Sequence, residues 1–336
     1  MNGRFRRALA GEPLATPPIW MMRQAGRYHS HYQRLRKRHS FDELCRTPAL
    51  AAEVAMGPIE DFDFDAAIVF SDLLYPLDAL GLTVSYDDGP PTFSRLLTPD
   101  TIDALARVDD ALPRLAFQWE AVARTRERLP ADKGLLGFVG GPWTLFIYAM
   151  CGSHAGPVDA ATSRPDLARA FANRVTPLLA GVIERQLAAG ADAVMIFDTS
   201  ASHRPTSWGV NAEVRLAEAF PGKLGYYAKG VSRADFDDAL LAAPWAGIGF
   251  DHAWPLADTL RDRPVRGFIQ GNFDQTALTR STDEFRRALD AYLAPLRGLT
   301  AAERRGWICG LGHGVLPSTP EDHIRTFVRT IRETFQ

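Results

Sequence analysis

A cluster of arginines near the start of the chain has the composition of an anion-binding site. Segment 17–39, PPIWMMRQAGRYHSHYQRLRKRH, contains no acid, and none occurs between Glu12 and Asp42. The whole chain carries 38 Lys and Arg against 40 Asp and Glu, for a formal net charge of −2, so this positive potential is local. A guanidinium group holds a carboxylate with two parallel hydrogen bonds. The segment therefore predicts a local anion-binding site.

Short apolar runs recur along the chain and must position this site. They cover 17–20, 66–70, 135–139, 193–197, 224–228, 246–250, 266–270 and 306–311. The runs are continuous rather than alternating, which is typical of strands buried on both faces of a parallel sheet. Amphipathic helices are predicted between them, over 47–62, 164–191, 281–296 and 319–335. The hydroxyls of Thr47, Ser281 and Thr319 are predicted to cap three of these helices.

Eight strand–helix units in 336 residues predict a closed (β/α)₈ barrel, formed by residues 1–336 as a single domain. A doubly wound open sheet is the alternative, and it is weaker because no glycine-rich phosphate loop follows an early strand. In a barrel, reactive side chains lie just past the carboxyl ends of the strands. Polar residues stand there in nearly every unit, and they are Arg23, Asp72, Asp198, Thr199, Asp251, His252, Asn272 and His313.

Composition excludes several classes of protein. A pI near 6.5 argues against a general nucleic-acid binder. The three cysteines, Cys45, Cys151 and Cys309, are few and far apart, so no disulfide framework is expected. The start MNGRFRRALAG does not resemble a secretory signal, and no apolar run approaches the roughly 20 residues that span a bilayer. We expect a cytoplasmic protein that binds neither nucleic acid nor membrane.

Several motifs resemble those of the uroporphyrinogen decarboxylase family. They are PIWMMRQAGR (18–27), FSD (70–72), GFVGGPWTLFIY (137–148), YYAKG (226–230), IQGNFD (269–274) and LGHGVLPSTPE (311–321), in the family's order over essentially the whole chain. The resemblance implies a single-domain barrel, usually a homodimer, without a metal or organic cofactor. It also implies removal of CO₂ from the four acetate side chains of uroporphyrinogen III, giving coproporphyrinogen III in haem and chlorophyll synthesis.

The resemblance also implies which residues act. The catalytic residues are Asp72 and Arg23, and the substrate-binding residues are Arg23, Gln24, Ala25, Gly26, Arg27, Arg36, Phe70, Asp72, Tyr148, Thr199 and His313. The main-chain N–H groups of residues 24–26 are expected to add donors for the substrate. Arg34, Lys37 and Arg38 are interpreted instead as the solvated face of a helix.

Asp72 is the unexpected group, because a carboxylate repels a polyanion. It suits the pyrrole N–H groups at the centre of the ring, where it stabilises the cation formed when a ring carbon is protonated. The alternative role is a helix N-cap after the second strand. The proton donor stays open between Arg23, whose pKa is high for an acid, and His313. Tyr148 either donates its hydroxyl to the substrate or to Asp72, or belongs to the core.

The chain departs from the family after the fourth run, where FDTSASHRP has Thr199 for the usual Ser and Ser202 for a glycine. Two rival functions follow. One is a tetrapyrrole-binding protein without catalysis. The other is a methyltransferase of the same superfamily, which uses a zinc-bound thiol and a cobalamin partner. The zinc pattern of that family is His-x-Cys with a distant Cys, and no His-x-Cys occurs here, so no metal site is expected.

Overall fold

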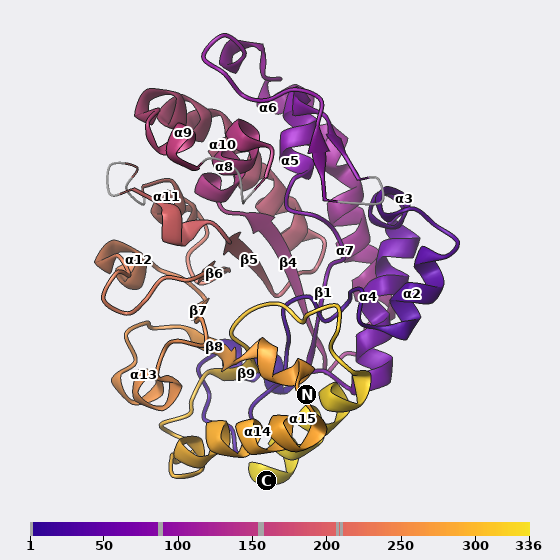
Figure 1. Cartoon of the computed structure of the whole chain (residues 1–336), viewed down its shortest axis with the longest axis vertical. Coiled ribbons are helices and arrows are strands. Elements are labelled where there is room, and N and C mark those ends of the chain that lie inside the picture. The colour runs from indigo at the N-terminus through magenta and orange to yellow at the C-terminus, as the bar shows by residue number, and fades with distance from the viewer. Residues whose placement is uncertain (1–2, 87–89, 154–157, 206–207, 209–210) are drawn as a thin grey trace.

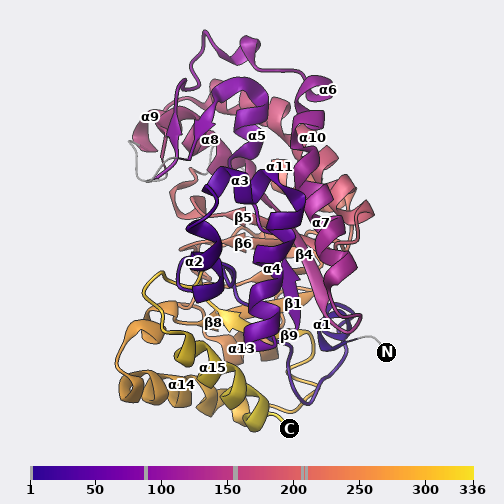
Figure 2. The same ribbon diagram turned by 90° about the vertical axis from the view of Figure 1, so that its right-hand side faces the viewer.

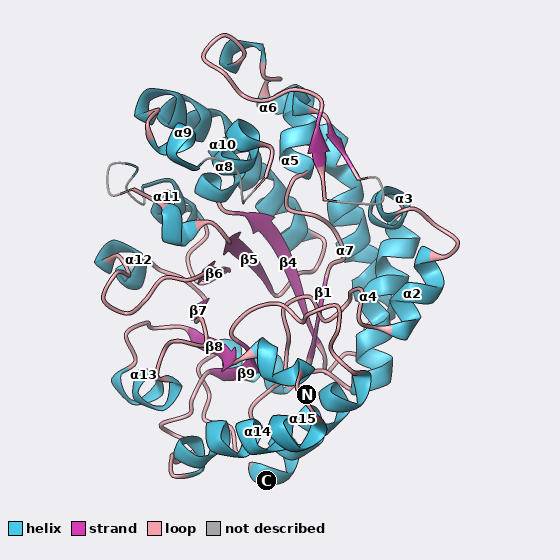
Figure 3. Ribbon diagram, viewed as in Figure 1, coloured by secondary structure: helices cyan, strands magenta, loops and turns pink. Residues whose placement is uncertain are grey.

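Seven parallel strands form one curved sheet with helices around its outside (Figures 1 and 3). The computed structural model describes residues 3–86, 90–153, 158–205, 208 and 211–336. In sheet order the strands are β1 (Ala66–Ile68), β4 (Gly134–Gly140), β5 (Ala193–Asp198), β6 (Leu224–Ala228), β7 (Gly247–Gly249), β8 (Phe268–Phe273) and β9 (Trp307–Leu311). The sheet order equals the chain order, which confirms the predicted parallel strand–helix alternation.

Most helices lie between consecutive strands or flank the sheet. Those before β4 are α1 (Arg4–Leu9), α2 (Ser30–Arg36), α3 (Phe41–Arg46), α4 (Pro48–Phe62), α5 (Tyr75–Leu77), α6 (Val108–Ala111) and α7 (Ala116–Arg128). Those after it are α8 (Pro142–Cys151), α9 (Val158–Thr162), α10 (Pro165–Ala188), α11 (Asn211–Ala219), α12 (Asp238–Ala242), α13 (Leu256–Asp262), α14 (Thr282–Arg297) and α15 (Glu321–Thr334). Among the described residues no helix is both long and apolar enough to cross a membrane.

An antiparallel hairpin, which the sequence did not predict, follows β1. It pairs β2 (Val84–Ser85) with β3 (Thr92–Phe93). Figure 2 shows this hairpin at the opposite end of the molecule from α14 and α15. The hairpin brings Tyr86 back towards the end of β1, which matters for the site below.

The first predicted strand, 17–20, is not a strand, so the sheet has seven strands where eight were predicted. Ile19 forms only an isolated parallel bridge to Cys309 of β9. Its main-chain N–H donates to the side chain of Asp65 at 2.8 Å instead of to a neighbouring strand. Pro17 and Pro18 have no N–H to offer. The segment still contacts both edges of the sheet, because the N–H of Asp65, next to β1, donates to the Ile19 carbonyl at 2.9 Å.

Two apolar cores lie on the two faces of the sheet. The larger fills the space between the strands and the surrounding helices. The smaller lies on the concave face and includes Trp20, Met22, Ala66, Ile68, Leu136, Met195, Phe197, Tyr227, Phe268 and Ile308. Phe5 of α1 joins this inner core and packs against Gly134, the first residue of β4. α1 therefore packs against the amino end of β4.

The helix caps agree only partly with the prediction. Ser281 and Glu284 form a reciprocal capping box at the start of α14. Thr47 is the N-cap residue of α4, but its side chain makes no capping bond. The cap of α15 is Pro320, so the prediction that the Thr319 hydroxyl caps this helix was wrong.

Candidate active site

Asp72 lies just past the carboxyl end of β1, and two donors hold one of its oxygens. Oδ1 accepts the main-chain N–H of Leu74 at 2.9 Å and the hydroxyl of Tyr86 at 3.0 Å. No described residue donates a hydrogen bond to Oδ2. Burial raises the pKa of the half-buried Asp72, whereas the two hydrogen bonds and the charge of Arg23 lower it, with a net rise. The hydrogen bond from the Leu74 N–H closes a local turn. Asp72 thus also makes one bond of the kind expected from a helix N-cap, the alternative role predicted for it.

Arg23 reaches this site by way of an unusual backbone. Its φ is +60°, in the left-handed region that costs a non-glycine residue about 1–2 kcal/mol. A Cβ on Gly314, in the loop after β9, would lie 2.5 Å from Cδ of Arg23, so the arginine side chain runs directly over this glycine. The charge of Arg23 lowers the pKa values of Asp72, Tyr148 and Tyr227. These four side chains from separate segments therefore converge.

Tyr148 of α8 belongs to the same group. It is half-buried, and burial together with the charge of Asp72 raises its pKa to about 12. Its hydroxyl therefore stays protonated at neutral pH. The structure thus brings together Asp72, Arg23 and Tyr148, as the sequence analysis expected.

The Tyr227 hydroxyl favours a hydrogen on Nδ1 of His313. The Tyr227 hydroxyl lies 2.7 Å from the carbonyl oxygen of Gly312 and 3.0 Å from Nδ1 of His313. A carbonyl oxygen only accepts, so the single hydroxyl hydrogen goes to Gly312. Nδ1 of His313 must then carry a hydrogen and donate it to the Tyr227 oxygen. The two rings also stack, with centroids 5.9 Å apart.

The main-chain N–H groups of residues 24–26 differ in whether they are already hydrogen-bonded. Gln24 is fully buried, its side chain donates to the Ala66 carbonyl, and its main-chain N–H donates to the Met21 carbonyl. The prediction that this N–H serves the substrate was therefore wrong. The main-chain N–H groups of Ala25 and Gly26 have no acceptor among the described residues.

Arg27 and Arg36 flank Tyr32 on α2, and their charges lower the pKa that burial of Tyr32 raises. Tyr32 in turn packs on Phe70, with ring centroids 5.6 Å apart. The Arg36 guanidinium donates to the His39 carbonyl at 2.7 Å. Both arginines thus lie near Tyr32, and Phe70 packs on the same tyrosine ring.

Thr199 follows a buried ionic cluster that the sequence analysis did not predict. Asp198, at the end of β5, accepts hydrogen bonds from Thr144, Arg204 and Tyr226. Glu213 of α11 lies 3.8 Å from Arg204. Burial and the charge of Asp198 raise the pKa of Glu213 to about 7. Asp198 is therefore buried and hydrogen-bonded within the protein, so it does not contact a substrate. Thr199, the next residue, is half-buried at the rim.

The described residues contain no group of three or more His, Cys, Asp and Glu side chains able to hold a metal ion. Cys45 and Cys309 are buried free thiols, and burial raises the pKa of each. Cys309 interacts with Tyr292, not with His313. His154, three residues after Cys151 in the sequence, lies outside the described residues.

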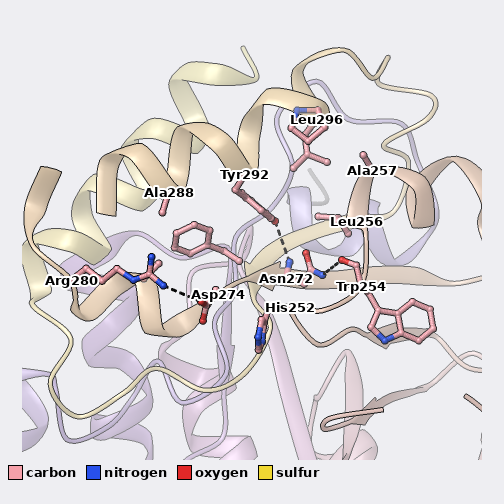
Figure 4. Close-up of a pocket in the computed structure, with 13 residues that line it drawn as sticks. His252, Trp254, Leu256, Ala257, Asn272, Asp274, Arg280, Ala288, Tyr292 and Leu296 are labelled. Atoms are coloured by element: carbon pink, nitrogen blue, oxygen red, sulfur yellow. Dashed lines mark hydrogen bonds and ion pairs between the residues drawn. The ribbon is translucent and has the colours of Figure 1, made fainter. Parts of the chain in front are cut away.

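A pocket lies between α13, α14 and the end of β8 (Figure 4). Its volume is about 280 Å³, at the lower end of the roughly 300–1,000 Å³ of small-ligand pockets. Its polar groups are already paired, since Tyr292 bonds to the Asn272 N–H and Asp274 to Arg280 (Figure 4). None of Arg23, Asp72 and Tyr148 lines it, so it is separate from the convergent site.

The fold and the site together define an α/β protein with an aspartate, an arginine and a tyrosine grouped near the carboxyl ends of its parallel strands. The family described as Uroporphyrinogen decarboxylase (URO-D) matches residues 1–334. The uroporphyrinogen decarboxylase of Salinibacter ruber is 38% identical over 99% of this chain and 96% of its own length. That of Solibacter usitatus is 32% identical over 99% and 98%. The chain belongs to the uroporphyrinogen decarboxylase family.

A solved methyltransferase from Methanosarcina mazei has a similar fold, with a TM-score of 0.78 over 99% of this chain and 98% of that one. Its sequence is only 18% identical, so the likeness concerns the fold alone.

Two residues at the site were missed by the sequence analysis. Tyr227 lies inside the YYAKG motif at the end of a predicted strand, so a signal for it was present. Tyr86 follows a two-residue strand of a hairpin that has no periodic pattern, and no sequence signal marked it.

Proposed function

We propose that this chain decarboxylates the four acetate side chains of uroporphyrinogen to give coproporphyrinogen. The observation that carries the proposal is the geometry of Asp72, a carboxylate held by one oxygen beside Arg23 and Tyr148 near the carboxyl ends of the strands. A single anion suits the ring of pyrrole N–H donors. Arg23, Arg27 and Arg36 suit the carboxylates at the edge of the substrate, where each charge-assisted bond contributes roughly 1.5–3 kcal/mol.

The reaction needs a proton before it can release CO₂. Protonation of the pyrrole carbon next to the acetate makes the ring an iminium cation. The electrons of the bond to the carboxylate then flow into the ring, CO₂ leaves, and a proton added to the resulting methylene carbon completes the methyl group as the ring gives up its extra proton. Oδ2 of Asp72 stabilises the cation. Because the positive charge develops only in the transition state, this carboxylate binds the transition state more strongly than the substrate.

Two groups are candidates for the proton donor, Arg23 and His313. Both lie next to Tyr227. A bell-shaped pH profile of kcat that loses one limb in His313→Gln assigns the proton to the histidine. An unchanged profile assigns it to Arg23.

Further features of the proposal concern the architecture and the state of the protein. The contacts of Ile19 with both Cys309 and Asp65 support an eighth strand position that closes the barrel. Family membership supports a homodimer in the cytoplasm and the type III isomer as substrate. Light scattering of the purified chain tests the dimer, and a comparison of type I with type III uroporphyrinogen tests the isomer.

The decisive experiment follows product formation from chemically reduced uroporphyrinogen without oxygen, with and without a strong chelator. We expect coproporphyrinogen and four CO₂ per ring in both conditions. Tight binding without product favours the tetrapyrrole-binding alternative. Activity abolished by the chelator and restored by zinc favours the methyltransferase-like alternative.

A further inference from the structure

Tyr86 connects the unpredicted hairpin to the catalytic end of β1. It follows Ser85, the last residue of β2. Its ring packs between Phe41 and Tyr75, with centroids 5.1 and 5.3 Å away. This packing directs the hydroxyl at Asp72, whose Oδ1 it meets at 3.0 Å.

The two donors to Asp72 make its oxygens unequal. The N–H of Leu74 and the hydroxyl of Tyr86 both bond to Oδ1. The Leu74 donor belongs to the same loop and fixes only the local turn, whereas Tyr86 comes from a separate element. Rotation of the carboxylate about its Cβ–Cγ bond breaks both contacts together, so the pair of donors keeps Oδ2 in one place.

We propose that Tyr86 is a positioning residue for the proposed decarboxylation, because its hydroxyl holds Oδ1 of Asp72 and so presents Oδ2 alone to the ring nitrogens. The inference rests on the proposed function for its consequence in catalysis, but the positioning itself is testable without substrate. Tyr86 does not touch the substrate in this account and acts only through Asp72.

The hydroxyl also favours the charged form of Asp72. The other titratable groups that face this carboxylate are Arg23 from the arginine segment, Tyr148 of α8 and Cys45 of α3. Burial raises the pKa of Asp72, and the bond from Tyr86 opposes that rise. Without the hydroxyl the pKa is higher still, so the carboxylate is protonated over a wider acidic range.

The test compares Tyr86→Phe with Tyr75→Phe. Both substitutions remove one hydroxyl from the same aromatic cluster, but the Tyr75 hydroxyl donates to Asp42, which keeps its ion pair with Arg46. In Tyr86→Phe we expect the acidic limb of kcat/KM to move up by about one pH unit, with up to about tenfold loss below it and recovery at higher pH. In Tyr75→Phe the limb should stay where it is.

A second readout separates this inference from the proposed function. The Asp72 carboxyl carbon, followed by NMR in the ligand-free chain, should titrate about one unit higher in Tyr86→Phe and unchanged in Tyr75→Phe. An unmoved Asp72 titration overturns the inference even if the chain is a decarboxylase. A shifted titration in a chain that forms no product upholds the positioning and rejects the function. A pH-independent loss shared by both variants with lowered melting temperatures shows that Tyr86 only packs.

Discussion

Replacement of Asp72 by Asn is expected to stop turnover while the chain still folds and binds its substrate. The structure makes Asn a close mimic, because the amide oxygen can accept from Leu74 and Tyr86 as Oδ1 does. The amide nitrogen must then occupy the place of Oδ2. Two N–H donors would face the pyrrole N–H groups, and the negative charge that stabilises the iminium would be gone.

The size of the effect follows from the lost charge. Opposite unit charges about 4 Å apart attract by about 4 kcal/mol at an effective dielectric constant near 20. Asp72 is only half-buried, so we take about 3 kcal/mol as the net loss, equivalent to roughly two orders of magnitude in kcat. The assay is anaerobic single-turnover decarboxylation with chromatography of the products.

Asp274→Asn is the matched control. Asp274 also follows a strand of the same sheet and also accepts the main-chain N–H two residues on, that of Thr276 at 2.9 Å. It lines the separate pocket, so kcat should stay within about twofold of the wild type. Retention of more than a tenth of the wild-type kcat by Asp72→Asn would refute the role given to this carboxylate.

Stability distinguishes loss of function from loss of fold. The folded-state pKa of Asp72 is raised, so the folded chain holds this proton more tightly than the unfolded chain does. Ionisation of Asp72 therefore costs stability as pH rises above the unfolded pKa. Asn carries no such cost, and the melting temperature at pH 7 should be equal to or above that of the wild type.

Three other variants test separate parts of the account. Because the folded-state pKa of Glu213 is raised to about 7, the wild type should lose stability between about pH 4.5 and 7. In urea unfolding, Glu213→Gln should remove this pH dependence and stabilise the chain by about 1–3 kcal/mol at pH 8. An equal pH dependence in both proteins would contradict this. Tyr227→Phe should change neutral His313 from the Nδ1-protonated form to a mixture of both tautomers in nitrogen NMR, and an unchanged spectrum would show that the hydroxyl does not set the tautomer. The double substitution Lys37→Gln and Arg38→Gln should leave KM within about twofold at 0.15 M salt, since both side chains are exposed and screened over about 8 Å; a larger rise would make them substrate contacts.

The sequence predicted the parts of the fold that depend on repeated local patterns. Seven of the eight apolar runs became strands in the expected order, because buried parallel strands leave a continuous apolar signal. The run 17–20 has the same composition but begins with two prolines. It still exchanges main-chain hydrogen bonds with Cys309 of β9, but the Asp65 side chain takes the N–H of Ile19. That contact joins residues 46 positions apart, and no local pattern encodes it.

The site was predictable to the extent that the motifs fix which residues approach the strand ends. Arg23, Asp72 and Tyr148 converge as expected, although they come from three segments. What the sequence did not reveal is how each group is held. Three features depend on the tertiary packing of buried polar groups, which leaves no periodicity in the sequence. They are the hydrogen bond from Tyr86 to Asp72, the direction of the hydrogen bond between Tyr227 and His313, and the position of Glu213 beside Asp198 and Arg204.

The most direct test of the account is a crystal structure of the chain with coproporphyrinogen, kept reduced throughout. The account predicts Oδ2 of Asp72 within about 3 Å of the pyrrole nitrogens, Oδ1 still bound to Tyr86, and Arg23 on a substrate carboxylate. A macrocycle seated elsewhere, or Asp72 turned away from the ring nitrogens, would contradict it.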